Sequence, residues 1–457
     1  MSIFIAIILL GLIILFHEFG HFIVAKANGV CVVEFSIGFG PRLFSFRKGD
    51  TDYCLKILPF GGSCRMLSSD EELYELDEEQ KEKRGHEFEK QSMNLIRKYG
   101  KAAAFETKSL PARIAVIAAG PIYNFILAFF MSVLMLGFMG VDTPTVSEVS
   151  HESIAYESGL REGDVITNVA GVGIVFDREL TRELQKHTSD SFDITYERDG
   201  VSYTAKINPI KKQDNIYKIG AALGEDASIS SIEDNSPAQK AKLKVNDKII
   251  QINSENVSSS KEVIEKIRSS DGKELTFKIE RGGQISDIQI IPNKTDSTTY
   301  DMGFSTSGER IKVNPWETIL YAFREVWYWI TTVIDLLGRM VTGRLSLNSL
   351  SGPVGTVSAI SNVIDASSSD GAFFVLMNVL YIGIMLSANL GIMNLLPIPG
   401  LDGGRLLLYL IEAIMGRPVP KEKEGIINFI GFIFIFQLLI RVGMQLYCFI
   451  YIKHWKF

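Results

Sequence analysis

The segment LGLIILFHEFGHFIVAK (residues 10–26) places ionisable side chains within an otherwise apolar stretch. Every residue at positions 3–16 is apolar or glycine, and His17, Glu18 and His21 follow before the apolar pattern resumes. An ionisable side chain at the centre of a bilayer costs roughly 2.5 to 3.5 kcal/mol on insertion scales. The segment therefore predicts a membrane helix that carries a functional polar site.

The spacing of the two histidines predicts a metal site. His17 and His21 are four residues apart, so on a helix their side chains lie on the same face. In the pattern H-E-x-x-H, two neutral imidazoles bind Zn²⁺ and the glutamate takes a proton from the attacking water. Histidines that only form hydrogen bonds between helices would leave Glu18 unexplained. We expect His17 and His21 to be metal ligands and Glu18 to be the general base.

A catalytic zinc ion keeps three protein ligands and one open position, so a third ligand is needed from elsewhere in the chain. In the segment NLLPIPGLDGGR (residues 394–405), Pro397 and Pro399 end an apolar helix shortly before Asp402. Asp402 could instead be the N-cap of a helix at 403–415. Because the two imidazoles need a partner, we expect Asp402 to be the third ligand.

Uncharged stretches of about 20 residues are long enough to cross a bilayer. The sequence predicts four such spans, at residues 2–25, 112–141, 372–396 and 426–452. The first contains the H-E-x-x-H motif, the second is uncharged from Ile114 onward, and the fourth is interrupted only by Arg441, near its far end. Residues 315–343 are also apolar, but they include charged residues and three tryptophans. That mixture is typical of an amphipathic helix that lies in the membrane interface rather than crossing it.

The chain between the first two spans begins with strand-like sequence. Residues alternate between apolar and polar on both sides of the turn Lys48-Gly49-Asp50, which predicts a β-hairpin against the membrane, followed by a charged loop within 26–110. Loops 26–110 and 397–425 are rich in Lys and Arg, which predicts that both are cytoplasmic. The metal site would then lie toward the cytoplasmic side, and residues 142–310 outside the cytoplasm.

Residues 142–310 are polar, rich in predicted strands and internally repeated. SIAYESGLREGDVITNVAG, from residue 153, aligns with SPAQKAKLKVNDKIIQINS, from residue 236, an offset of 236 − 153 = 83 residues. FDITYERDG, from residue 192, aligns with LTFKIERGG, from residue 275, at the same offset. One unit has therefore been duplicated, and we expect two domains, at 142–222 and 223–310.

Composition argues against two other classes of protein. The net charge of −6 offers no basic surface, so nucleic-acid binding is not expected. The four cysteines, Cys31, Cys54, Cys64 and Cys448, form no C-x-x-C pair, and nothing suggests a disulfide framework.

Three motifs carry a resemblance to a known family. HEFGH (17–21), GPIYNF (120–125) and NLLPIPGLDGG (394–404) resemble, in this order, the site-2 protease family of intramembrane zinc metalloproteases (family M50). The repeats resemble the circularly permuted PDZ domains of its bacterial regulator-of-sigma-E protease branch. The resemblance extends over essentially the whole chain.

The resemblance implies a polytopic α-helical membrane protein of the bacterial inner membrane. It would have four transmembrane helices, a membrane-associated β-hairpin, an interfacial amphipathic helix and two inserted PDZ domains. Residues 1–141 and 372–457 would form the two halves of the protease core, and 311–371 the amphipathic helix and its connector.

The resemblance also implies roles for single residues. His17, His21 and Asp402 would bind Zn²⁺, and Glu18 would be the general base. The remaining residues implied are Asn394, Gly61 and Gly62 for substrate binding and Asn124 as a support beside the metal helix. For both asparagines an ordinary hydrogen bond between helices is the alternative.

The implied substrates are transmembrane segments of single-span membrane proteins, such as anti-sigma factors or remnant signal peptides. The PDZ domains would bind peptide ends, or would only act as spacers or size filters. A catalytically inactive PDZ-bearing scaffold and a zinc transporter are the rival functions. The intact H-E-x-x-H and Asp402 argue against the scaffold, and the lack of further acidic and histidine pairs in the spans argues against the transporter.

Overall fold

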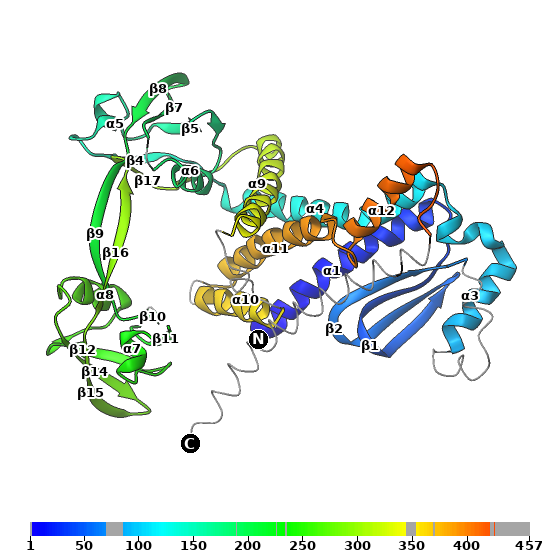
Figure 1. The fold of residues 1–457 in the computed structure, drawn as a ribbon, viewed down its shortest axis with the longest axis horizontal. Helices are drawn as coiled ribbons and strands as arrows, with labels where there is room; N and C mark the ends of the chain where they lie inside the picture. The colour runs from blue at the N-terminus through cyan, green and yellow to red at the C-terminus, as the bar shows by residue number, and fades with distance from the viewer. Residues whose placement is uncertain are drawn as a thin grey trace. The chain divides into compact units, whose positions relative to one another are not determined.

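The computed structural model describes residues 2–69, 86–188, 190–224, 226–233, 235–343, 353–368, 371–420 and 425 (Figure 1). The chain divides into two compact units, one of residues 142–309 and one of the segments on either side of it. The predicted span at 426–452 lies outside the described residues.

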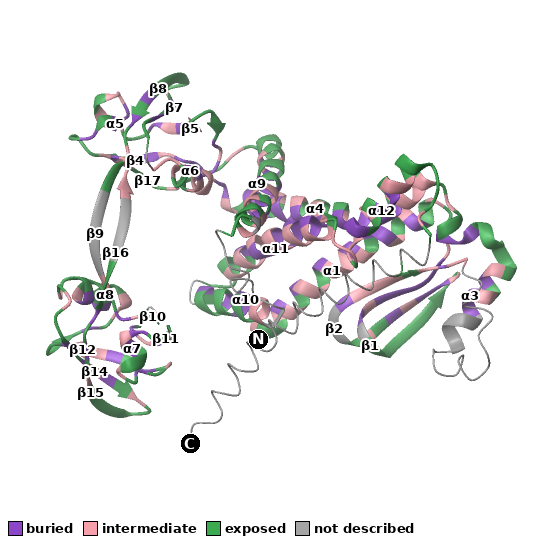
Figure 2. Cartoon of the chain, viewed as in Figure 1, coloured by how far each residue is buried: buried purple, intermediate pink, exposed green. Residues whose placement is uncertain are grey.

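Among the described residues, three helices are long and apolar enough to cross a membrane: α1 (Ser2–Ala27), α4 (Leu110–Met139) and α11 (Ala372–Leu395). Both α1 and α11 pack against α4. Small residues allow this close approach, since a Cβ at Gly20 of α1 would overlap the Ala119 carbonyl of α4. The contacting faces are buried and the outer faces expose large apolar side chains, as helices in lipid require (Figure 2).

Helix α9 (Pro315–Val341) covers the predicted amphipathic segment and packs against α4 and α11. Trp316 and Trp327 are exposed, whereas Glu325 is fully buried and accepts a 2.9 Å hydrogen bond from Nε1 of Trp329. The buried face of α9 is therefore mainly apolar, with residues such as Ala322 and Val326 around the paired Glu325, and the opposite face exposes large apolar side chains. Its place in the membrane interface stays a prediction.

Two shorter helices complete the described part of this unit. Helix α10 (Pro353–Ser367), within the segment expected to be a connector, packs against α1 and α11. Helix α12 (Asp402–Met415) packs against α4 and α11. Leu401 is its N-cap and Asp402 its first residue, so the alternative role of Asp402 as an N-cap is wrong.

The predicted hairpin is present as β1 (Val32–Lys48) and β2 (Thr51–Met66), but it is folded a second time. Residues 34–37 have partners on both sides, at 52–55 and at 62–65. Each long strand therefore folds back on itself and contributes two segments, in the spatial order 42–48, 51–56, 32–37 and 62–66. The central pairing of 34–37 with 52–55 is parallel in register, and the two outer pairings are antiparallel. Gly38, Gly40 and Gly61, with φ of 86°, 91° and 103°, supply the backbone conformations that permit the additional bends.

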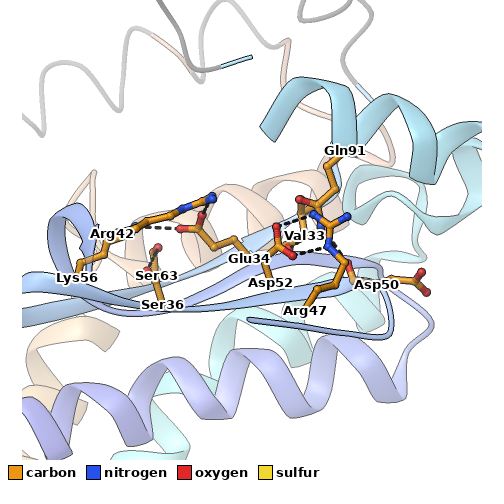
Figure 3. A network of polar contacts seen from close by, with 10 residues as sticks. All are labelled: Val33, Glu34, Ser36, Arg42, Arg47, Asp50, Asp52, Lys56, Ser63 and Gln91. Carbon is orange, nitrogen blue, oxygen red and sulfur yellow. Dashed lines mark hydrogen bonds and ion pairs between the residues drawn. The ribbon is translucent and has the colours of Figure 1, made fainter. Parts of the chain in front are cut away.

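The two faces of this sheet differ. On one face Phe35 and Tyr53 pack against Phe22 of α1. On the other, buried Glu34 pairs with Arg42 at 2.6 Å and with Lys56 at 2.9 Å (Figure 3). Burial raises the pKa of the Glu34 carboxyl, but the two cations outweigh it and hold that pKa below its usual range.

The same polar face ties the sheet to its neighbours. Ser36 and Ser63 share a 2.8 Å hydrogen bond that joins the central segment to the edge segment 62–66. Gln91, from α3 (His86–Tyr99), donates to the carbonyl of Val33 at 3.3 Å (Figure 3). The sheet is thereby held between α1 and α3.

The other unit contains two lobes, each with a four-stranded antiparallel sheet. The elements of lobe 1 are β4 (Val146–Val149), α5 (Ile154–Glu157), β5 (Val165–Val169), β6 (Val172–Gly173), α6 (Asp177–Leu184), β7 (Phe192–Arg198) and β8 (Val201–Ile207). Those of lobe 2 are β10 (Ala221–Leu223), β11 (Ile229–Ile232), α7 (Pro237–Lys240), β12 (Lys248–Ile252), β13 (Glu255–Asn256), α8 (Ser260–Arg268), β14 (Leu275–Arg281) and β15 (Gln284–Ile290). Short strands β3 (Val141–Asp142) and β18 (Arg310–Ile311) lie where the chain enters and leaves the unit.

Lobe 2 is inserted into lobe 1. Strands β9 (Ile210–Lys218) and β16 (Asn293–Asp301) form a ribbon that leads into lobe 2 and back. The next strand, β17 (Phe304–Thr306), then pairs with β4, and Phe304 packs against the lobe 1 core. The first lobe, expected at 142–222, therefore takes a strand from within the range 223–310 that was expected for the second copy.

This nesting predicts that Gly303→Ala destabilises lobe 1, more than 90 residues away in sequence from its last strand. Gly303 has a φ of 79° and a Cβ there would overlap the Ser153 side chain. In lobe 2, Gly220 has a φ of 72°, and a Cβ there would overlap the Ser236 side chain. Each substitution should lower the free energy of unfolding of its lobe by about 1–3 kcal/mol. Hydrogen exchange of the full chain should show lost protection in lobe 1 for Gly303→Ala and in lobe 2 for Gly220→Ala; the reverse pattern would contradict the nesting.

Candidate metal centre

Helix α1 and the start of α12 bring three ligand atoms together. His17 and His21 are 7% and 6% exposed, and their Nε2 atoms are 3.3 Å apart. Oδ2 of Asp402 lies 3.1 Å from Nε2 of His17 and 3.3 Å from Nε2 of His21. Ligands held about 2.0–2.1 Å from a tetrahedral zinc ion are roughly 3.3 Å from one another. The triangle therefore has the dimensions of a zinc site.

The outer ring nitrogens set the tautomers of both histidines. Nδ1 of His21 lies 2.8 Å from the Val116 carbonyl, which can only accept, so Nδ1 carries the proton and Nε2 a lone pair. Nδ1 of His17 lies 3.1 Å from Nδ2 of Asn124, whose Oδ1 is buried with no hydrogen-bond partner among the described residues. With the amide turned by 180°, Oδ1 would accept from Nδ1 and His17 would also present a lone pair.

The three ligand atoms then converge as electron-pair donors without a proton between them. Oδ2 of Asp402 is itself buried without a hydrogen-bond donor among the described residues. An anion and two lone pairs in one buried site fit a divalent cation, and the nitrogen and oxygen donors suit zinc.

Glycines make room for the site. A Cβ at Gly120 of α4 would lie 2.6 Å from Cε1 of His21 and 2.8 Å from Cε1 of His17. Both imidazoles therefore pack directly against the backbone of this residue. A Cβ at Gly404 would lie 2.5 Å from the Ile398 carbonyl oxygen, and one at Gly403 would overlap the carbonyls of residues 395 and 396. The first turn of α12 can therefore fold back on the chain that precedes it. The sequence motifs contain these glycines, but they do not reveal which side chains lie against them.

Glu18 faces a different neighbour. A Cβ at Gly62 of β2 would lie 2.9 Å from Cγ of Glu18 and 3.0 Å from the Ser36 carbonyl oxygen. The edge segment 62–66 therefore runs beside the glutamate next to the metal ligands. Asn394 is partly buried in the last turn of α11 and is not one of the three residues of the metal cluster.

Comparison with known proteins identifies the same family throughout the chain. The family model described as peptidase family M50 matches residues 5–438. Zinc metalloprotease RasP of Geobacillus kaustophilus is 30% identical over 443 residues, which are 95% of each chain. Regulator of sigma-E protease RseP of Escherichia coli is 29% identical over 469 residues, or 96% of each chain. These matches span both the helices that carry the metal cluster and the two-lobed unit.

We expect Gly120→Ala to weaken zinc binding by at least about tenfold, the lower end for changes beside metal ligands. The added methyl group would displace both imidazoles, and α4 cannot move away because it packs on α1 through Gly20. Gly137→Ala on the same helix is the matched control, since its Cβ would meet only a Thr318 methyl group at 4.0 Å. Zinc titration of purified protein measures the effect; equal affinities for the two variants would contradict this account of Gly120.

Proposed function

The chain belongs to peptidase family M50 and is a zinc metalloprotease, and we propose that it cuts peptide bonds within or near the transmembrane segments of single-span membrane proteins. One observation carries the proposal. The buried cluster of His17, His21 and Asp402 lies among helices apolar enough to cross a bilayer. A hydrolytic site in that position is useful only for substrates that are themselves in the membrane.

The side chains have separate tasks in this mechanism. His17, His21 and Asp402 would hold the zinc ion, with Val116 and Asn124 fixing the imidazoles. When bound, zinc lowers the pKa of a water molecule to about 7 and polarises the substrate carbonyl. Glu18 accepts the proton of the attacking water and returns it to the departing amine, the usual double role of a general base.

A transmembrane substrate must be unwound before it can be cut, because a helix keeps its carbonyls in its own hydrogen bonds. The freed backbone groups need partners, since lipid offers none. The edge segment 62–66 is suited to supply them by adding the substrate as a further strand. Gly61 and Gly62 would then hold the scissile bond beside Glu18, and Asn394 would bind the substrate backbone.

The two-lobed unit would select substrates outside the membrane as a pair of PDZ domains. A cavity of about 250 Å³ lies between β10 and α8 of lobe 2. Apolar side chains such as Ile264 and Ile267 line it together with Lys218, Glu233 and Arg268. A strand edge beside a helix suits an extended peptide end. A filter that excludes bulky substrates is the second role that this unit could have.

The expected location is the bacterial inner membrane, with the metal site toward the cytoplasm and the two-lobed unit outside it. Among relatives, the name regulator of sigma-E protease points to control of a sigma factor. We extend that role here to single-span anti-sigma factors as substrates, with remnant signal peptides as a second class.

Glu18→Gln should abolish cleavage while leaving zinc bound. The amide is nearly isosteric but cannot accept the proton, so the rate should fall by about 10²–10⁴-fold. A model single-span substrate in membranes reports cleavage, and metal analysis reports zinc. Removal of zinc with a chelator should abolish cleavage by the parent protein, and added zinc should restore it. Cleavage by Glu18→Gln at the parental rate would end the protease proposal.

Gly62→Ala should slow cleavage without loss of zinc. Its methyl group would push either Glu18 or the edge segment 62–66 out of place, and a displacement of about 1 Å can cost 10²-fold in rate. Gly338→Ala in α9 is the control, because a Cβ there meets nothing within 4 Å. An unchanged rate for Gly62→Ala would show that this segment does not position the base or the substrate.

A further inference from the structure

A second polar contact joins the helices of the metal site, away from the metal ligands. Arg113 of α4 donates two hydrogen bonds to Glu412 of α12, at 3.1 Å to Oε2 and 2.5 Å to Oε1. The guanidinium carbon lies 5.0 Å from the ring centre of Tyr409, which is 8% exposed. The side chains of Arg113 and Glu412 are 14% and 13% exposed. This is a largely desolvated, two-pronged ion pair stacked on an aromatic ring.

The contact belongs to one face of α4. Arg113, Val116, Gly120 and Asn124 are separated by three, four and four residues, which is the spacing of a single helical stripe. Val116 fixes His21, Asn124 contacts His17, and Gly120 lies under both imidazoles. Arg113 extends the stripe to the helix that carries the third ligand. One surface of α4 thus contacts each part of the metal centre.

The position of Asp402 depends on how α12 is held. Asp402 is the first residue of this helix, so it has only the turn at 396–401 before it. Tyr409 and Glu412 follow by seven and ten residues, which places Tyr409 about 20° and Glu412 about 80° around the helix from Asp402, both on the half of α12 that carries it. A planar guanidinium bound at two points fixes both the distance and the rotation of its partner. Rotation of α12 would carry Asp402 away from the imidazoles.

We propose that Arg113, Glu412 and Tyr409 are positioning residues that hold α12 so that Asp402 reaches the metal. The inference rests on the proposed function and adds three residues to it that do not contact the metal. Because the ion pair spans 299 residues of sequence, it also joins the two halves of the membrane unit.

The test is zinc affinity of the purified full-length protein, measured by competition with a coloured chelator. Arg113→Gln and Glu412→Gln should each bind zinc about tenfold more weakly, as expected when support for a metal ligand is removed. Arg113→Lys keeps the positive charge but cannot form both hydrogen bonds in the planar geometry of a guanidinium, so its zinc affinity should be intermediate. The exchange of charges in Arg113→Glu with Glu412→Arg should restore most of the affinity. Cobalt(II) absorption, which reports the coordination number, should change in the single variants and recover in the exchange.

The matched control is Arg198→Gln in lobe 1, which removes two 2.7 Å hydrogen bonds to Asp164. It should keep the parental zinc affinity. Parental zinc affinity and parental cobalt spectra in both Arg113→Gln and Glu412→Gln would overturn the inference. If the single variants do not fold, the double variant Arg113→Glu with Glu412→Arg decides. Weak zinc binding by that variant in its folded state would also overturn the inference. Failure of the proposed function is distinct, since it would appear as cleavage by Glu18→Gln at the parental rate or as a parent without activity.

Discussion

The membrane unit depends on one electrostatic constraint: two imidazole lone pairs and a carboxylate oxygen meet within 3.3 Å in a buried place. Uncompensated, such a cluster would be strongly unfavourable, because each donor has lost water and gained no proton. A divalent cation converts this repulsion into binding energy. The surrounding structure can then be understood as the means of keeping three donors at metal-ligand distance while lipid and solvent are excluded.

Helix α4 provides most of that support. It contributes no metal ligand, yet its glycine at 120 admits the imidazoles and its Val116 carbonyl and Asn124 side chain hold their outer nitrogens. Close packing in lipid depends on small residues, because apolar side chains gain little from leaving one apolar environment for another. The approach of α1 to α4 through Gly20 follows that rule. Precision at the metal therefore comes from backbone proximity and not from a large core.

The sequence predicted those parts of the site whose chemistry is local. Spacing alone put His17 and His21 on one helical face, and an unusual acid after a proline-broken helix singled out Asp402. The turn at Gly49 likewise predicted a hairpin, but the second pairing of residues 34–37, with 52–55, forms only because both long strands fold back on themselves, which the alternating pattern did not indicate. The repeats revealed the duplication but not that β17 completes lobe 1. The Arg113–Glu412 contact was hidden for the same reason, since neither residue is unusual in its own neighbourhood.

The adjacency of His17 and Glu18 explains how one helix can serve both the metal and the substrate. Successive residues of an α-helix point about 100° apart. His17 therefore faces α4 and α12, where it is 7% exposed, while Glu18 faces β2 at Gly62. The metal ligands lie on the buried side, where rigid packing fixes them, and the base lies beside a strand edge that can accept another strand. The adjacent pair H-E therefore places a metal ligand and the base on different sides of one helix within a single turn.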